Sequence, residues 1–146
     1  MYKRILMPVD GSEVSNYAAE EGFRLAQTLG SETVLQYVID ISILTLPDAE
    51  LGMSNIDVVR DSFQEQGEKV LKILSEKAKE MGVAFSTIVS EGNVHDEIIK
   101  TAEEKNADLI VMGTHGRRGL NRLLLGNVAD SVARRAHCAV LLIRPM

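Results

Sequence analysis

Several features that would define a protein class are scarce or absent in this chain. One cysteine in 146 residues leaves no disulfide framework and no cysteine zinc site within the chain. No apolar run reaches the roughly 18 residues of a membrane span. Pro8 and Asp10 end the first apolar run too early for a signal peptide. The length suits one domain, residues 1–146, and these absences predict that it lies in the cytoplasm and not in a membrane.

Charge is too sparse and too mixed for a disordered chain or a nonspecific DNA-binding protein. Charged residues make up 25% and hydrophobic residues 45%, and the net charge is −5. Residues 114–146 nevertheless hold six of the 16 basic side chains and one of the 21 acidic ones. A basic segment in an acidic chain suggests a confined anion site. Scattered, solvated arginines would give the same count.

Short apolar runs alternate with helical periods along the chain. The runs predict strands at residues 3–9, 33–39, 83–89, 108–112 and 139–143. Helical spacing predicts helices from Ser12 to Gly30 and at about residues 55–81, 94–105 and 127–136. Residues 40–54 show no clear period and are expected to form a loop. The alternation predicts an α/β fold, a single doubly wound parallel sheet with helices on both faces.

The candidate functional residues follow the predicted strands. Ligands of doubly wound sheets bind beyond the carboxyl ends of the strands, where the strand order reverses. After the fourth predicted strand, glycines expose backbone amides to an anion, arginines add positive charge, and a helix beginning near Asn127 directs its positive end to the same place. These candidates are Gly113, Gly116, Gly119, Gly126, Arg117, Arg118 and Arg122. Alternatively, the glycines only permit tight turns and Asn127 only caps the helix.

The familiar catalytic motifs are missing. There is no Gly-x-x-x-x-Gly-Lys-Ser/Thr loop, and no Gly-x-Gly-x-x-Gly follows the first strand, which disfavours P-loop hydrolases and dehydrogenases. An aspartyl-phosphate enzyme would need a second acid at the position of Ser12. The three histidines lack the spacing of a metal site. We expect His115 to be exposed in the glycine-rich loop, with ligand contact as the alternative, and Cys138 to be a small buried hydrophobe.

The spacing Gly113-x-x-Gly116-x9-Gly126-Asn127 resembles the nucleotide motif of the universal stress protein family, Gly-x2-Gly-x9-Gly-Ser/Thr. The segments Ile5-Leu-Met-Pro-Val-Asp-Gly-Ser12, Tyr37-Val-Ile-Asp40, Ala107-Asp-Leu-Ile-Val-Met-Gly-Thr-His-Gly116 and Cys138-Ala-Val-Leu-Leu-Ile-Arg-Pro145 also match. The resemblance spans essentially the whole chain. It implies a five-stranded parallel sheet in the order 3-2-1-4-5, with a crevice between the strands that end at Asp10 and Gly113.

The resemblance also implies an adenine-nucleotide site for ATP, ADP or AMP. The adenine is expected near Pro8, Val9 and the backbone of Val38, with Met112 beside the base. Asp10 is expected to hold the ribose or to lie near a bound Mg²⁺ ion. The implied nucleotide-contacting residues are Pro8, Val9, Asp10, Val38, Met112, Gly113, Thr114, His115, Gly116, Arg117, Arg118, Gly119, Gly126, Asn127, Val128 and Ala129.

One residue departs from the family pattern. Asn127 stands where the motif has Ser or Thr, whose hydroxyl donates to phosphate. Losing one hydrogen bond to a charged group costs about 1.5–3 kcal/mol, or about ten- to a hundredfold in affinity, unless the Asn127 amide replaces it.

For the whole protein, the resemblance implies a stress-response module that acts as a nucleotide-dependent switch with little or no hydrolysis. A slow ATPase or phosphotransferase and a structural dimerisation module with a non-binding pocket are the alternatives. A homodimer is expected through the last strand, residues 139–143, because an apolar sheet edge invites pairing with another chain.

Overall fold

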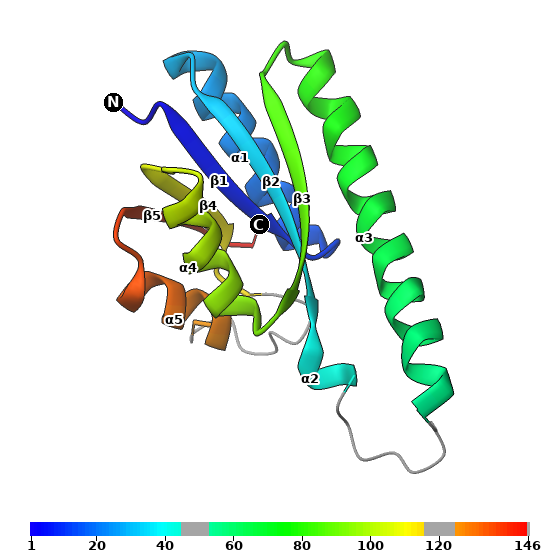
Figure 1. Cartoon of the computed structure of the whole chain (residues 1–146). Helices are drawn as coiled ribbons and strands as arrows, with labels where there is room; N and C mark the ends of the chain where they lie inside the picture. The colour runs from blue at the N-terminus through cyan, green and yellow to red at the C-terminus, as the bar shows by residue number, and fades with distance from the viewer. Residues whose placement is uncertain (45–52, 116–124, 146) are drawn as a thin grey trace.

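The computed structural model describes residues 1–44, 53–115 and 125–145. The strands are β1 (Arg4–Val9), β2 (Glu32–Asp40), β3 (Phe85–Gly92), β4 (Leu109–Gly113) and β5 (Ala139–Ile143). The helices in these ranges are α1 (Glu13–Leu29), α2 (Ile41–Leu44), α3 (Met53–Glu80), α4 (Val94–Glu104) and α5 (Asn127–Arg135). All strand pairs are parallel, in the order β3-β2-β1-β4-β5, which confirms the expected doubly wound sheet (Figure 1).

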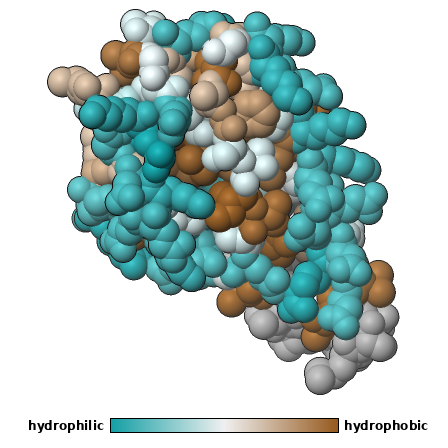
Figure 2. Space-filling view, turned by 45° about the horizontal axis from the view of Figure 1, so that its top comes forward, coloured by the Kyte–Doolittle hydropathy of each residue, from teal (hydrophilic) through white to brown (hydrophobic). Residues whose placement is uncertain are grey.

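Helices cover both faces of the sheet and form two apolar layers. Along β1, successive side chains point to opposite faces. Ile5 packs in the layer that contains Phe23 of α1 and the inner residues of α3. Leu6 packs in the other layer, with Ile98 of α4 and Val132 of α5. The outer side of α3 is mostly hydrophilic, as Figure 2 shows, although Val58 and Ile73 are exposed, and its inner face packs on the sheet.

The segment after α3 differs from the expectation. β3 begins at Phe85 and not at residue 83, because the chain first turns at Gly82, where φ is +68°, and the Val83 N–H donates to Ala78 O at 2.9 Å. Val83 is buried in this turn. β3 also continues to Gly92, three residues beyond its expected end. The apolar character of Val83 was therefore a sign of burial and not of strand pairing.

The expected loop at residues 40–54 is also shorter than its aperiodic sequence suggested. Residues 41–44 form the one-turn helix α2, and α3 begins at Met53. Residues 45–52 lie outside the described part of the chain. No helix in the described ranges is long and apolar enough to cross a membrane.

The central strands β1 and β4 are paired over a short length. Their ladder joins Ile5 to Leu109 and Leu6 to Ile110, whereas β1 pairs with β2 along its whole length. The β1–β4 pairing therefore stops short of the carboxyl ends of both strands. Pro8, beyond the last pair, has no N–H to donate to a neighbouring strand. Because the strand order reverses between β1 and β4, this is the place where the fold offers a crevice.

Candidate functional site

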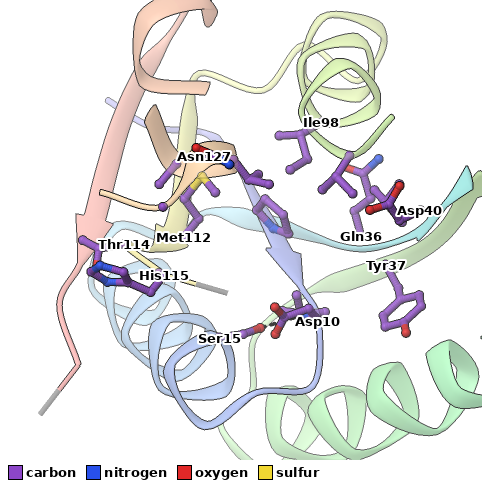
Figure 3. A pocket seen from close by; sticks show the side chains of 18 of the residues that line it. Asp10, Ser15, Gln36, Tyr37, Asp40, Ile98, Met112, Thr114, His115 and Asn127 are labelled. Atoms are coloured by element: carbon purple, nitrogen blue, oxygen red, sulfur yellow. Dashed lines mark hydrogen bonds between the residues drawn. The ribbon is translucent and has the colours of Figure 1, made fainter. Parts of the chain in front are cut away.

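A pocket of about 410 Å³ lies beyond the carboxyl ends of β1, β2 and β4 (Figure 3). This volume is within the range of small-molecule sites. The structure brings most of the expected residues together in its lining: Pro8, Val9, Asp10, Val38, Met112, Gly113, Thr114, His115, Gly126, Asn127, Val128 and Ala129. Gly116, Arg117, Arg118, Gly119 and Arg122 lie outside the described residues, so their role remains a prediction.

The turn between β1 and α1 holds Asp10 at the edge of the pocket. The Ser12 N–H donates to Asp10 Oδ1 at 2.9 Å, and the Asp10 N–H donates to Ser15 Oγ at 2.9 Å. Gly11 between them has φ of +86°, a conformation that side chains rarely adopt. Ser12 caps α1, as expected, by accepting from the Ser15 N–H at 3.2 Å. The carboxylate is thus positioned by the backbone of its own turn.

The first turn of α5 forms another wall. Gly126, and not Asn127, is the N-cap residue, and it provides no side-chain cap. The backbone amides of Asn127, Val128 and Ala129 follow the cap, where a helix leaves N–H groups without intrahelical acceptors. All three residues line the pocket. The helix end therefore directs partial positive charge at the pocket, which favours an anion there.

The end of β4 connects this helix to the sheet. The Thr114 N–H donates to Ile143 O at 3.0 Å, and Thr114 O accepts from the Gly126 N–H at 2.9 Å. Gly113 allows α1 to approach closely, because a Cβ atom there would lie 2.7 Å from Val14 Cγ1. A side chain at 113 would therefore push the helix and the strand apart.

The expectation that His115 is exposed was wrong. Its side chain is 9% exposed and lines the pocket. The Nδ1 atom lies 2.8 Å from Thr114 Oγ1, and Figure 3 shows the two side chains next to each other. This contact holds the imidazole ring beside the Thr114 side chain and out of solvent. His115 is thus part of the pocket wall, and its contact with a ligand stays a prediction.

Several lining residues were not expected from the sequence. Tyr37 and Asp40 belong to a segment that resembles the family, but no role was predicted for their side chains. Gln36 could have been noticed, because it is a polar residue inside an apolar strand. Ile39 lies between Tyr37 and Asp40 in β2, and the others reach the pocket from helices whose positions periodicity does not define. The unexpected lining residues are Ser15, Gln36, Tyr37, Ile39, Asp40, Phe63, Val94 and Ile98.

The lining combines three chemical properties. Aliphatic and thioether side chains such as Val38, Ile98 and Met112 form an apolar wall, Asp10 supplies a carboxylate, and the start of α5 supplies amides. This combination suits a flat, apolar group joined to an anion. Within the described ranges no three His, Cys, Asp or Glu side chains converge on a metal position. A cation beside Asp10 would therefore need ligands from a bound phosphate and water, which is the usual coordination of Mg²⁺.

Comparisons with known proteins agree with this architecture. Residues 1–144 match the sequence model of the Universal stress protein family. Universal stress protein MJ0531 of Methanocaldococcus jannaschii is 40% identical over 144 residues, which cover 99% of this chain and 83% of that protein. The solved structure of MJ0577 from the same organism superimposes with a TM-score of 0.88 at 27% identity, covering 100% of this chain and 98% of that one.

A more distant solved structure carries a ligand. A universal stress protein from Arabidopsis thaliana with AMP bound has a TM-score of 0.71 at 18% identity, covering 99% of this chain and 92% of that one. At this identity the likeness establishes the fold.

Proposed function

This chain belongs to the universal stress protein family, and we propose that it binds an adenine nucleotide, with ATP as the first candidate, as a ligand-dependent switch. One observation carries the proposal: the first turn of α5 and an apolar wall face the same pocket, with Asp10 at its edge. The AMP bound to a protein of the same fold supports an adenine nucleotide as the occupant.

Each part of a nucleotide has a matching part of the pocket. The adenine lies against Pro8, Val38 and Met112, which present apolar surface to a flat ring. The Asp10 carboxylate accepts from a ribose hydroxyl. The phosphates lie at the start of α5, where the backbone amides of Asn127 and the next two residues donate to them. Alternatively, Asp10 is the protein ligand of a magnesium ion that the phosphates hold.

A charge placed at the start of α5 tests the phosphate position. Asn127→Asp keeps the size of the side chain but puts a negative charge beside the proposed phosphates. Acidic residues favour a helix N-terminus, so the fold should be unharmed or slightly stabilised. We expect the Kd for ATP with Mg²⁺, measured by calorimetry, to rise at least about tenfold, which corresponds to about 1.4 kcal/mol.

A matched control makes the same chemical change elsewhere. Asn106→Asp alters an exposed residue three positions before the first residue of β4, at the end of the sheet opposite the pocket. Its Kd should equal that of the wild type. Absence of saturation at millimolar ATP in the wild type would refute the proposed function. Equal affinities in Asn127→Asp and the wild type would refute the phosphate position.

We expect little turnover of the bound nucleotide. One oxygen of Asp10 already accepts from the Ser12 N–H at 2.9 Å, and the carboxylate is assigned here to the ribose or to Mg²⁺, so it is not available to activate water. Rapid ADP production that Asp10→Ala removes would instead favour an ATPase or a phosphotransferase.

A second proposal concerns assembly through β5. This strand is an edge of the sheet, and its Leu141 side chain is 42% exposed. An exposed apolar edge can pair with a second copy of the chain. Light scattering should give twice the monomer mass for the wild type and the monomer mass for Leu141→Lys. Val58→Lys, on the outside of α3 at 66% exposure, is the control and should stay dimeric. A wild-type monomer at micromolar concentration would overturn this proposal.

A further inference from the structure

A fully buried amide side chain lies in the pocket wall. Gln36 is 0% exposed and stands in β2, two residues before Val38 and on the same face of the strand. Its Nε2 atom donates to Thr101 Oγ1 at 2.8 Å, Ser90 Oγ at 3.0 Å and Glu97 O at 3.2 Å, acceptors that compete for its two protons. Gln36 is thus anchored to α4 and β3 by its nitrogen.

The other end of this amide has no partner among the described residues. Gln36 Oε1 is buried and accepts no hydrogen bond from residues 1–44, 53–115 or 125–145. The orientation follows from Glu97 O, because a carbonyl only accepts and so must face the NH₂ group. Buried polar atoms are nearly always paired in native proteins, so an exception calls for an explanation, of which a ligand is one.

The surroundings of Gln36 favour a ligand. Gln36 lines the pocket together with Val38, Val94 and Ile98, which have no polar side-chain atoms (Figure 3). A polar group set among apolar ones in a pocket fixes the orientation of what binds there. It also rejects a close analogue that cannot pair with it, because the analogue leaves the polar group unsatisfied.

We infer that Gln36 is a specificity-determining residue whose Oε1 accepts a hydrogen bond from the exocyclic amino group of the bound base. The inference rests on the proposed function, since it concerns the base end of the same pocket. Adenine supplies an amino donor on its edge. A purine without that group leaves Oε1 unpaired, and hypoxanthine places a carbonyl oxygen against it.

The test compares two nucleotides in two proteins. ATP and purine riboside triphosphate differ in the amino group alone. In the wild type, ATP should bind about three- to tenfold more tightly, the range for one neutral hydrogen bond. Gln36→Met keeps the length of the side chain but removes the amide, and it should lower this ratio at least threefold. Thr101 can then bond to Glu97 O one turn earlier, so we expect the fold to persist.

A matched variant separates the oxygen from the rest of the network. Thr101→Val removes a partner of Nε2 and leaves Oε1 in place, so its ratio should stay within twofold of the wild type. An unchanged ratio in Gln36→Met, or an equal fall in Thr101→Val, would overturn the inference while ATP binding still stands. Wild-type protein that binds neither nucleotide would overturn the proposed function and this inference together.

A third nucleotide makes the test independent of any variant. ITP should bind the wild type more weakly than purine riboside triphosphate does, because two acceptor oxygens would face each other. Equal or tighter binding of ITP would contradict the role of Gln36.

Discussion

Replacing Gly113 by alanine should strain the junction between β4 and α1. The added Cβ would lie 2.7 Å from Val14 Cγ1 and 3.4 Å from His115 O. Carbon atoms in contact are normally about 3.5–4.0 Å apart, so the helix or the strand must shift by about an ångström. Because φ at Gly113 is not positive, the strain comes from this contact and not from the backbone. Overpacking of this kind costs about 1–3 kcal/mol.

The expected loss is measurable by thermal and urea unfolding followed by circular dichroism. For a chain of this length the melting temperature falls about 2–4 °C per kcal/mol, so Gly113→Ala should lower it by roughly 2–12 °C. ATP affinity should fall as well, because Thr114 and His115 follow Gly113 directly in the pocket wall.

A second substitution identifies the cause. Val14→Ala removes the methyl group that the new Cβ would meet, so Gly113→Ala should cost much less in a Val14→Ala background. The difference between the two costs is the coupling energy of a double-mutant cycle, expected at about 1–2 kcal/mol. The reasoning is refuted if Gly113→Ala is neutral, or if its cost is the same with and without the Val14 methyl groups.

Three further outcomes are expected. Ser12→Ala removes the N-cap of α1 and should lower the free energy of unfolding by about 1 kcal/mol in urea titrations. Burial alone would raise the pKa of Asp108, but backbone N–H groups of Lys3 and Arg4 donate to its carboxylate and lower the pKa below its ordinary value. The Asp108 carboxylate therefore stabilises the fold above about pH 4, and this stabilisation is lost as the pH falls through the lowered pKa. In urea titrations at a series of pH values, the free energy of unfolding should fall less on acidification in Asp108→Asn than in the wild type. Asn127→Ala should weaken ATP binding about tenfold in calorimetry without lowering the melting temperature, because the side chain is exposed.

The sheet could be predicted because its local signals agree with one another. Every strand except β3 contains an apolar run, and residues with special backbone conformations separate several of the strands from the helices. Gly30 is an example: it ends α1 with φ of +70°, and its N–H donates to Ala26 O. The strand order was implied by the family resemblance, which also selected the crevice between β1 and β4.

The predictions for Val83 and His115 were wrong because the burial of both residues depends on tertiary contacts that the local sequence does not specify. Val83 is apolar because it is buried in a turn, and its sequence neighbours do not distinguish this from strand pairing. His115 is a polar residue in a glycine-rich segment, which is typical of exposure, yet its ring is buried beside Thr114. Phe63 and Ile98 reach the pocket from helices whose placement over the sheet periodicity leaves open.

Thr114 shows why the two proposals for this protein are not physically independent. Its N–H donates to Ile143 O at the end of β5, and its carbonyl accepts from the Gly126 N–H at the start of α5. One residue thus fixes the last residue of the proposed dimer strand and the cap of the proposed phosphate-binding helix. If a phosphate binds at α5 as proposed, it would stabilise Gly126 and, through the hydrogen bonds of Thr114, the end of β5. Any effect of nucleotide on dimerisation must then be matched by an equal effect of dimerisation on nucleotide affinity, because coupling between two binding equilibria is reciprocal.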